Sequence, residues 1–249
     1  MTNKHVFALF VKDCSSKALY FVHENIILIS DPECMLRITQ ILRLATGDNL
    51  ILFDEKKEFL CQLERAGKRE VKLIILSEKN HTRIGASVTV FLPILKKDDF
   101  DAALYALAAV GVEIIQLITT EKTQRSWQGA KDRTRSENIL IAAAEQSKYF
   151  SMPLIKDPQP LAKLLEIFVD KKTLRVLADP AGSPVSNLCA IDRKFHRIDM
   201  LVGPEGGLTD KELSDARRAN FEPFCLTPTI LKAEHAISIL SGLLRSVFY

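Results

Sequence analysis

The chain has 249 residues, of which 47% are hydrophobic and 26% are charged, and its formal net charge is +3. This composition is typical of a soluble globular protein that buries a sizeable core in one large domain or two modest ones. The net charge is too small to indicate nucleic-acid binding by itself, so any RNA or DNA site has to be a local patch.

The cysteines and the termini point to a reducing compartment. The thiols are scattered, with no C-x-x-C pair and no Cys/His spacing typical of a metal site, so we expect free thiols and no metal. They are Cys14, Cys34, Cys61, Cys189 and Cys225. The N-terminus has no apolar signal region, and no run approaches the roughly 18–20 apolar residues of a membrane span. We therefore expect a cytoplasmic protein without a membrane segment.

Short runs rich in β-branched or aromatic residues fill the N-terminal part of the chain. They are Val6–Val11, Leu19–Phe21, Ile26–Ile29, Leu50–Phe53, Phe59–Leu63 and Val71–Leu76. One helix is predicted over Glu33–Leu42, with Asp31 as its cap and Pro32 at its first position. Several short strands with a single helix predict a small β-barrel over residues 1–77.

The polar stretch Ser77–Ser87 has no periodic pattern and is interpreted as a linker, at about residues 78–87. Beyond it, over residues 88–249, strands alternate with helices. Strands are predicted at Val88–Leu92, Val112–Ile118, Leu174–Ala178, Ile198–Val202 and Phe224–Leu226. Helices are predicted at Asp98–Val110 (capped by Asp98 and ended by Gly111), Thr134–Lys148, Leu161–Phe168, Asp210–Asn220 and from about Ala233. This alternation predicts an α/β domain with a parallel sheet covered on both faces.

Two strand-to-helix loops near the C-terminus carry the most specific signal. The first loop is Gly203-Pro204-Glu205-Gly206-Gly207, and a T-x-x-E capping box at Thr209–Glu212 fixes the start of the next helix. Free backbone N–H groups at that start suit an anion or a polar ligand group, although a tight connection that binds nothing gives the same pattern. The loop is neither a Rossmann fingerprint nor a P-loop, which disfavours phosphate binding.

The second loop, Leu226–Lys232, follows the last predicted strand and is broken by a proline. Ile230 and Leu231 are apolar where a solvent loop would be polar, and they could line a flat ring-shaped ligand. Lys232 and Glu234 at the next helix start fit a site, a solvated ion pair or a capping interaction. A third loop, Asp179–Pro184, meets the other two only if their strands are neighbours. The stripe Ile237, Leu240, Leu244 and Phe248 of the last helix indicates core or a subunit interface.

One polar stretch combines positive charge with the single tryptophan of the chain. It contains Lys122, Arg125, Trp127, Lys131, Arg133 and Arg135. Cations beside an exposed aromatic side chain suit single-stranded nucleic acid, and the alternative is a solvated loop with Trp127 packed against the body. Arg37 and Arg43, around the helix of the first domain, form a weaker second patch.

These motifs together resemble the RsmE family of 16S ribosomal RNA uridine N3-methyltransferases, which belong to the SPOUT class. The resemblance rests on Gly203–Gly207, on Leu226–Glu234, on Ala144-Glu145-Gln146-Ser147, and on Ile41–Leu44 with Gly47-Asp48. It implies an N-terminal PUA-like β-barrel that helps to hold RNA, and a C-terminal SPOUT α/β domain with a trefoil knot. It also implies a homodimer that acts on 16S rRNA in the small ribosomal subunit, with S-adenosylmethionine as cofactor.

Carried over by position, the resemblance assigns roles to individual residues. The cofactor residues are Leu177, Ala178, Gly203, Pro204, Glu205, Gly206, Gly207, Leu226, Thr227, Ile230 and Leu231. Lys232 and Glu234 are the catalytic candidates that orient the target base. The candidates for RNA contact are Arg37, Arg43, Arg125 and Trp127.

The chain also departs from the family pattern. Leu36 and Arg37 replace paired histidines, and Lys148-Tyr149 replaces Gly-Arg. Further changes are Ala106 for lysine, Ala109 for glutamate, Thr229 and Lys232 for arginines, and His235 for threonine. Two alternatives therefore stay open: an RNA-binding relative without methyl transfer, and a SPOUT enzyme that methylates another rRNA or tRNA position.

Overall fold

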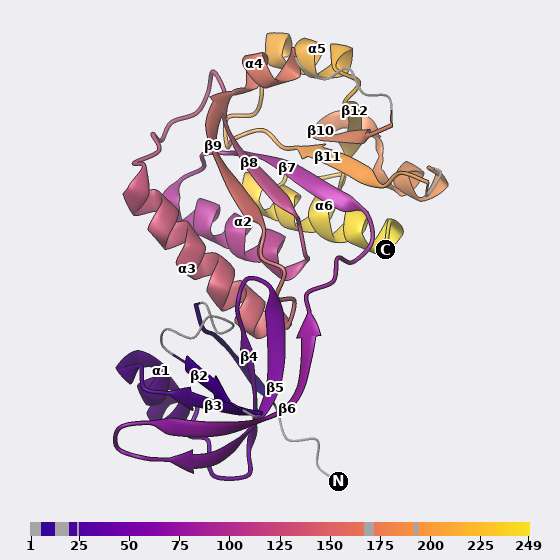
Figure 1. Ribbon diagram of the computed structural model, residues 1–249. Coiled ribbons are helices and arrows are strands. Elements are labelled where there is room, and N and C mark those ends of the chain that lie inside the picture. The colour runs from indigo at the N-terminus through magenta and orange to yellow at the C-terminus, as the bar shows by residue number, and fades with distance from the viewer. Residues whose placement is uncertain (1–5, 13–19, 24, 167–171, 192–193) are drawn as a thin grey trace. The chain divides into compact units, whose positions relative to one another are not determined.

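The computed structural model describes residues 6–12, 20–23, 25–166, 172–191 and 194–249, and the chain forms two compact units (Figure 1). Unit 1 comprises Met1–Thr82 with Ala144–Ser151, and unit 2 comprises Arg83–Ala143 with Met152–Tyr249. Cys14, Leu19 and Phe168, which belong to sequence predictions, lie outside the described residues. No helix in the described ranges is long and apolar enough to cross a membrane.

Unit 1 is built on one sheet of six strands in the order β1-β4-β5-β6-β3-β2. The strands are β1 (Phe7–Phe10), β2 (Tyr20–His23), β3 (Ile26–Ile29), β4 (Asn49–Phe53), β5 (Lys57–Ala66) and β6 (Val71–Asn80). Neighbouring strands are antiparallel except β1 and β4, which are parallel. Alternate side chains such as Leu9, Leu52 and Leu63 are buried in a single core. The runs rich in β-branched and aromatic residues therefore form strands whose alternate side chains fill this core.

The predicted helix of the N-terminal part begins as expected and then widens. Asp31 caps α1 (Pro32–Leu36) by accepting the N–H of Cys34 at 2.8 Å, with Pro32 at the first position. The chain continues as a π-helical segment, Arg37–Ile41, in which Leu42 N–H donates to the carbonyl of Arg37. One predicted helix is thus an α-turn followed by a π-turn, because five-residue hydrogen bonds replace four-residue ones.

Residues Ala144–Ser151, far along the sequence, belong to unit 1. The carboxylate of Glu145 accepts the N–H of Phe10 at 2.9 Å and a guanidinium N–H of Arg37 at 2.6 Å. Lys148 donates its ammonium to the carbonyl of Val6 at 2.6 Å, and burial lowers the pKa of this lysine. Glu145 and Lys148 therefore hold the two ends of β1, a role that the order of residues along the chain could not reveal.

The predicted linker is partly strand. β6 runs through Asn80, and its outer half pairs with β5 over Lys57–Leu60. Residues 76–80 are exposed, so they carry no hydrophobic alternation and read as patternless in the sequence. A long two-stranded ribbon held by backbone hydrogen bonds explains why a polar segment is extended here.

Unit 2 contains a second six-stranded sheet, in which every pair of neighbours is parallel and the order is β12-β10-β11-β7-β8-β9. The strands are β7 (Ser87–Pro93), β8 (Ile114–Thr119), β9 (Leu154–Pro160), β10 (Leu174–Pro184), β11 (Arg197–Leu201) and β12 (Glu222–Cys225). The sequence pattern did not predict β9, which contains two prolines and mostly exposed residues. It lies at the sheet edge, where proline is tolerated.

Helices cover both faces of this sheet (Figure 1). They are α2 (Lys97–Ala109), α3 (Ala130–Ser147), α4 (Leu161–Leu165), α5 (Asp210–Arg218) and α6 (Ala233–Val247), with a 3-10 turn at Val185–Ala190. Val90 and Met200 face the core made with α2, α3 and α6, whereas Phe91 and Leu201 face α4 and α5. The predicted stripe of α6, from Ile237 to Phe248, is buried in the first of these cores.

Two local predictions in unit 2 need correction. The N-cap position of α2 is Lys96, and Asp98 lies in the first turn instead. The predicted loop Asp179–Pro184 belongs to β10, because after an irregularity Ser183 and Pro184 pair with Phe224 and Cys225. The parallel α/β sheet itself is as predicted, while the trefoil knot stays a prediction.

Candidate active site

The first loop, the second loop and the Asp179–Pro184 segment of β10 meet on one side of the unit 2 sheet. β10 lies between β11 and β12, so the chain that follows each of these strands emerges at the same side. A pocket of about 710 Å³ opens there, lined by residues of all three segments. The condition that the sequence left open, that the strands be neighbours, is therefore met for β10, β11 and β12.

The first loop is held in shape from several directions. Gly207 has a φ of 69°, and its N–H donates to the carbonyl of Pro204 at 2.8 Å, which closes a tight turn. Glu205 accepts the N–H of Lys96 at 2.8 Å, and Lys122 donates to the carbonyl of Gly206 at 2.9 Å. Because its polar groups are tied to other segments, the loop presents a fixed wall to the pocket.

The predicted capping box at the end of the first loop is confirmed. Thr209 accepts the N–H of Glu212, and the Glu212 carboxylate accepts the N–H of Thr209 in return. Glu212 also accepts the N–H of Glu121 at 2.9 Å. One nearly buried carboxylate thus fixes both the start of α5 and the segment that follows β8.

The second loop supplies apolar surface. Leu226 and Leu231 are half-buried and pack against the core below, whereas Ile230 is 88% exposed. The Thr227 hydroxyl donates to the carbonyl of Thr229 at 2.8 Å and holds the turn. An isoleucine so exposed beside two packed leucines leaves apolar area that a flat ring could cover.

A buried carboxylate lies where α6 begins. Glu234 lines the pocket with its side chain 8% exposed, and its Oε1 is 3.7 Å from the ammonium of Lys232. Its Oε2 is buried and has no hydrogen-bond partner among the described residues. His235 Nε2 lies 3.8 Å from the same Oε1. A buried oxygen without a donor is costly, so this atom is suited to accept a hydrogen bond from a ligand.

The structure brings together nearly all the residues that the sequence assigned to this site. Those that line the pocket are Ala178, Gly203, Pro204, Glu205, Gly206, Gly207, Leu226, Thr227, Ile230, Leu231, Lys232 and Glu234. Leu177 does not line it. Its side chain is fully buried in the core on the α4–α5 face, because successive residues of a strand point to opposite faces.

Several pocket residues were not predicted from the sequence. Lys96 and Asp99 come from the start of α2, and no motif marked them. Asp179 was noticed only as part of a loop, yet its buried carboxylate lies on the pocket wall. Only the position of a polar residue directly after the apolar run Leu174–Ala178 could have singled it out.

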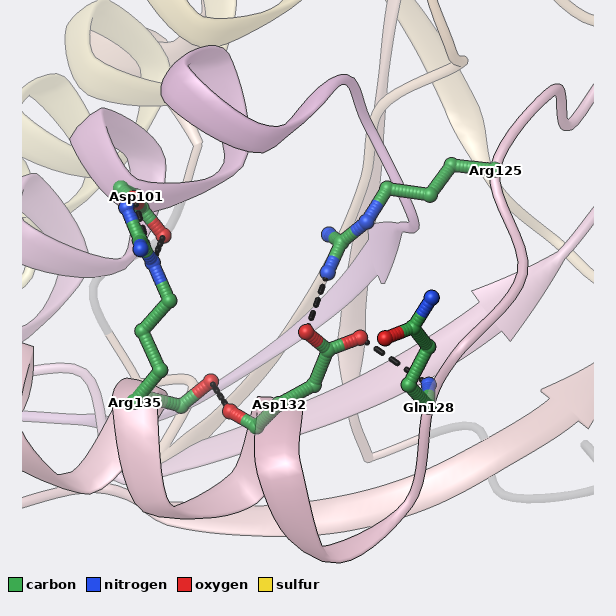
Figure 2. A network of polar contacts seen from close by, with 6 residues as sticks. Asp101, Arg125, Gln128, Asp132 and Arg135 are labelled. Atoms are coloured by element: carbon green, nitrogen blue, oxygen red, sulfur yellow. Dashed lines mark hydrogen bonds and ion pairs between the residues drawn. The ribbon is translucent and has the colours of Figure 1, made fainter.

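The RNA candidates of unit 2 are engaged within the fold. In Figure 2, Arg125 extends toward Asp132, and these two side chains form an ion pair at 2.5 Å. The Arg125 guanidinium also lies 5.4 Å from the ring centre of Phe100, and Trp127 packs edge-on against the same ring. The alternative with Trp127 packed against the body is thus the one observed. Arg135 is likewise held by Asp101, a contact that raises its pKa.

The candidates of unit 1 differ from one another. Arg37 is 30% exposed and bound to Glu145, whereas Arg43 is exposed beside a hollow of about 340 Å³. Arg43 has a φ of 52°, which ends the helical segment before it. Of the two, Arg43 is the cation with its side chain available to a partner. Within the described ranges, no group of three or more side chains could hold a metal ion.

Comparison with known proteins gives a family. A family described as RNA methyltransferase domain matches residues 82–245, and one described as RNA methyltransferase PUA domain matches residues 38–76. The ribosomal RNA small subunit methyltransferase E of Synechocystis is 28% identical over 81% of this chain and 67% of its own length. The protein of the same name from Rickettsia conorii is 28% identical over 80% of this chain and 81% of its own.

A solved structure agrees at the level of the fold. The small subunit methyltransferase E of Neisseria gonorrhoeae, crystallised bound to S-adenosyl methionine, matches with a TM-score of 0.79 and 22% identity over 98% of each chain. The two-part fold predicted from the sequence, a PUA-like domain followed by an α/β methyltransferase domain, is therefore confirmed. The chain belongs to the RNA methyltransferase family, and its relatives there include the ribosomal RNA small subunit methyltransferase E proteins.

Proposed function

We propose that this protein transfers a methyl group from S-adenosylmethionine to N3 of a uridine in the 16S rRNA of the small ribosomal subunit. The observation that carries the proposal is the pocket at the ends of β10, β11 and β12, with the unpartnered oxygen of Glu234 in its wall. Membership of the RNA methyltransferase family supports the reaction class. The names of the relatives support the small-subunit substrate.

The residues of the pocket fit the cofactor. A volume of about 710 Å³ suits a ligand of nucleoside size with a side chain. Leu226, Ile230 and Leu231 would hold the adenine ring, and the rigid first loop, Gly203–Gly207, would approach the ligand through its backbone. When bound, S-adenosylmethionine supplies an already activated methyl group, so the protein has to position the acceptor and assist loss of its proton.

Lys232 and Glu234 have the chemistry for the acceptor base. The N3 of uridine carries a proton, and the buried Oε2 of Glu234 can accept a hydrogen bond from this N–H and then the proton. The Lys232 ammonium, at the N-cap of α6 and 70% exposed, can donate to a uracil carbonyl oxygen as negative charge develops. Lysine keeps the positive charge of the family's arginine but donates from a single point.

The direct test uses purified protein, S-adenosylmethionine and small subunits that lack the modification. Mass spectrometry of the rRNA nucleosides should detect N3-methyluridine. Replacing Glu234 with glutamine should lower the rate about a hundredfold while leaving RNA binding unchanged. Lys232→Met removes the charge with little change in length and tests the second role. RNA binding without any methylated product would favour the alternative of a binding protein, and a methyl on another atom or nucleotide would favour another SPOUT reaction.

We also propose that the active species is a homodimer in the cytoplasm. Ile239 of α6 is 37% and Tyr249 is 85% exposed, and such large exposed apolar side chains in one unit support an interface. Light scattering on the purified protein measures the mass directly. A monomeric mass at micromolar concentration would count against the dimer without affecting the proposed chemistry.

A further inference from the structure

Asp179 occupies the middle of the pocket wall. It follows Ala178, which pairs with Phe224 of β12, and Leu177, which pairs with Leu201 of β11. Because β10 lies between the two neighbouring strands, Asp179 stands between the first loop and the second. It is 9% exposed and lines the pocket.

The carboxylate of Asp179 uses only part of its capacity to accept hydrogen bonds. Oδ1 accepts the N–H of Ala181 at 2.9 Å, and Oδ2 accepts a guanidinium N–H of Arg217 at 3.4 Å. An ionised carboxylate offers about four acceptor sites on its two oxygens. Each oxygen of this buried group can therefore accept a further hydrogen bond from a ligand in the pocket.

The ion pair with Arg217 determines which kind of ligand group can gain from a hydrogen bond to Asp179. Arg217 lies on α5 and balances the negative charge of Asp179, so a second cation would gain little there. Neutral donors such as hydroxyl groups still gain a hydrogen bond to a charged acceptor. Glu234 is different, because its Oε2 has no partner at all among the described residues.

We propose that Asp179 accepts hydrogen bonds from the ribose hydroxyls of S-adenosylmethionine and makes the site selective for the ribonucleoside cofactor. The inference rests on the proposed function. In the cofactor the ribose lies between the adenine and the methionine moiety, and Asp179 lies on the central strand between the two loops. A carboxylate just past the apolar run of a parallel strand is a chemically suitable acceptor for a ribose diol, as is the acidic residue of dinucleotide-binding folds. Arg217 is a positioning residue that acts through Asp179.

Calorimetry with stable cofactor analogues tests this assignment. The probes are S-adenosylhomocysteine, its 2′-deoxy and 3′-deoxy forms, and 5′-methylthioadenosine, which lacks the amino-acid part. The wild-type protein should bind S-adenosylhomocysteine about tenfold to a hundredfold more tightly than at least one deoxy form. Asp179→Asn, which can still accept the Ala181 N–H, should bind it more weakly by a similar factor and discriminate less between the ribo and deoxy forms. The same loss is expected for 5′-methylthioadenosine.

Asp215→Asn is the matched control, because Asp215 also pairs with an arginine of α5, Arg218, but lies outside this pocket. It should bind every probe as the wild type does. Equal wild-type affinity for the ribo and both deoxy forms would overturn the inference, even if Asp179→Asn failed to fold. So would a loss confined to S-adenosylhomocysteine, since that would place Asp179 at the ammonium group. No binding of S-adenosylhomocysteine at all would overturn the proposed function as well.

Discussion

The backbone N–H of Lys96 donates to Oε1 of Glu205 at 2.8 Å, so a carboxylate from the first loop caps a helix more than a hundred residues earlier in the chain. Lys96 is the N-cap residue of α2 and makes no side-chain capping bond of its own. Glu205 thus links the conformation of the loop to the start of a helix whose first turn also lines the pocket.

This link predicts that Glu205→Ala lowers the free energy of unfolding by about 1 kcal/mol, the usual effect of removing a helix cap. Glu205→Gln keeps an acceptor oxygen and should lose less. Asp98→Ala is the comparison, because Asp98 is the first-turn acid that the sequence suggested as the cap. Urea denaturation measures all three, and a larger effect at Asp98 than at Glu205 would contradict the assigned cap.

Gly182 allows β10 to lie against β12. A Cβ at this position would be 2.5 Å from the backbone N of Phe224 and from the backbone C and O of Pro223. Because backbone atoms cannot move aside as a flexible side chain can, Gly182→Ala should destabilise the protein by more than 1 kcal/mol, the order seen for overpacking. It should also weaken cofactor binding, since the displaced strand leads into the second loop.

Gly242→Ala is the control for that substitution. Gly242 lies inside α6, and its added Cβ would meet nothing within 4 Å. Alanine in a helix interior should therefore raise stability by about 0.5–1 kcal/mol. Thermal melting of the two variants should move in opposite directions. A stable Gly182→Ala protein with unchanged ligand affinity would show that β10 and β12 do not need this close approach.

The features predicted correctly from the sequence are those that residues close in the chain determine. Asp31 with Pro32, and Thr209 with Glu212, specify helix starts through hydrogen bonds only a few residues long, and both predictions are confirmed. The loops around the pocket were also predicted, because proline and glycine directly after an apolar run mark turns.

What the sequence missed depends on distant partners. β9 is polar and holds two prolines, and only its position at the sheet edge makes it a strand. Glu145 looked like a motif of the second domain, but its carboxylate binds Phe10 and Arg37 in unit 1. The orientation of Leu177 away from the pocket follows from the register of β10, which no local pattern specifies.

Because of the lowered pKa of Lys148, we expect the free energy of unfolding to depend on pH. Burial lowers this pKa in the folded state, although Glu145 partly offsets the effect. Between the lowered pKa and the ordinary value near 10.5, the unfolded chain binds the proton more strongly than the folded one. Stability contributed by this group therefore rises with pH across that window.

Lys148→Met removes the titrating group and keeps a similar side-chain length. The difference in unfolding free energy, wild type minus variant, should increase as pH is raised from 7 toward 10 in urea titrations. Lys131→Met, a change at an exposed lysine, should leave the pH profile of the wild type unchanged. A difference that stays flat or falls with pH would mean that the folded state does not disfavour the charged ammonium at Lys148.

Substitutions of Arg125 and Lys131 should distinguish a side chain that stabilises the fold from one that is free to bind RNA. Arg125 is bound to Asp132, whose side chain is 9% exposed, and Asp132 also accepts the N–H of Gln128 (Figure 2). Arg125→Ala leaves this carboxylate nearly buried without its cation, so it should lower the free energy of unfolding by about 2 kcal/mol. Arg125→Lys, which keeps the charge, should lose less.

Lys131 is exposed and has no ion pair within the described part of the chain. Lys131→Ala should therefore change stability by less than about 0.5 kcal/mol, but should weaken RNA binding and make its dependence on salt shallower. Fluorescence anisotropy with an rRNA fragment at several salt concentrations gives both quantities. If Arg125→Ala weakened RNA binding at unchanged stability, Arg125 would be a direct RNA contact, because a side chain needed only for the fold cannot lose a ligand without loosening the fold.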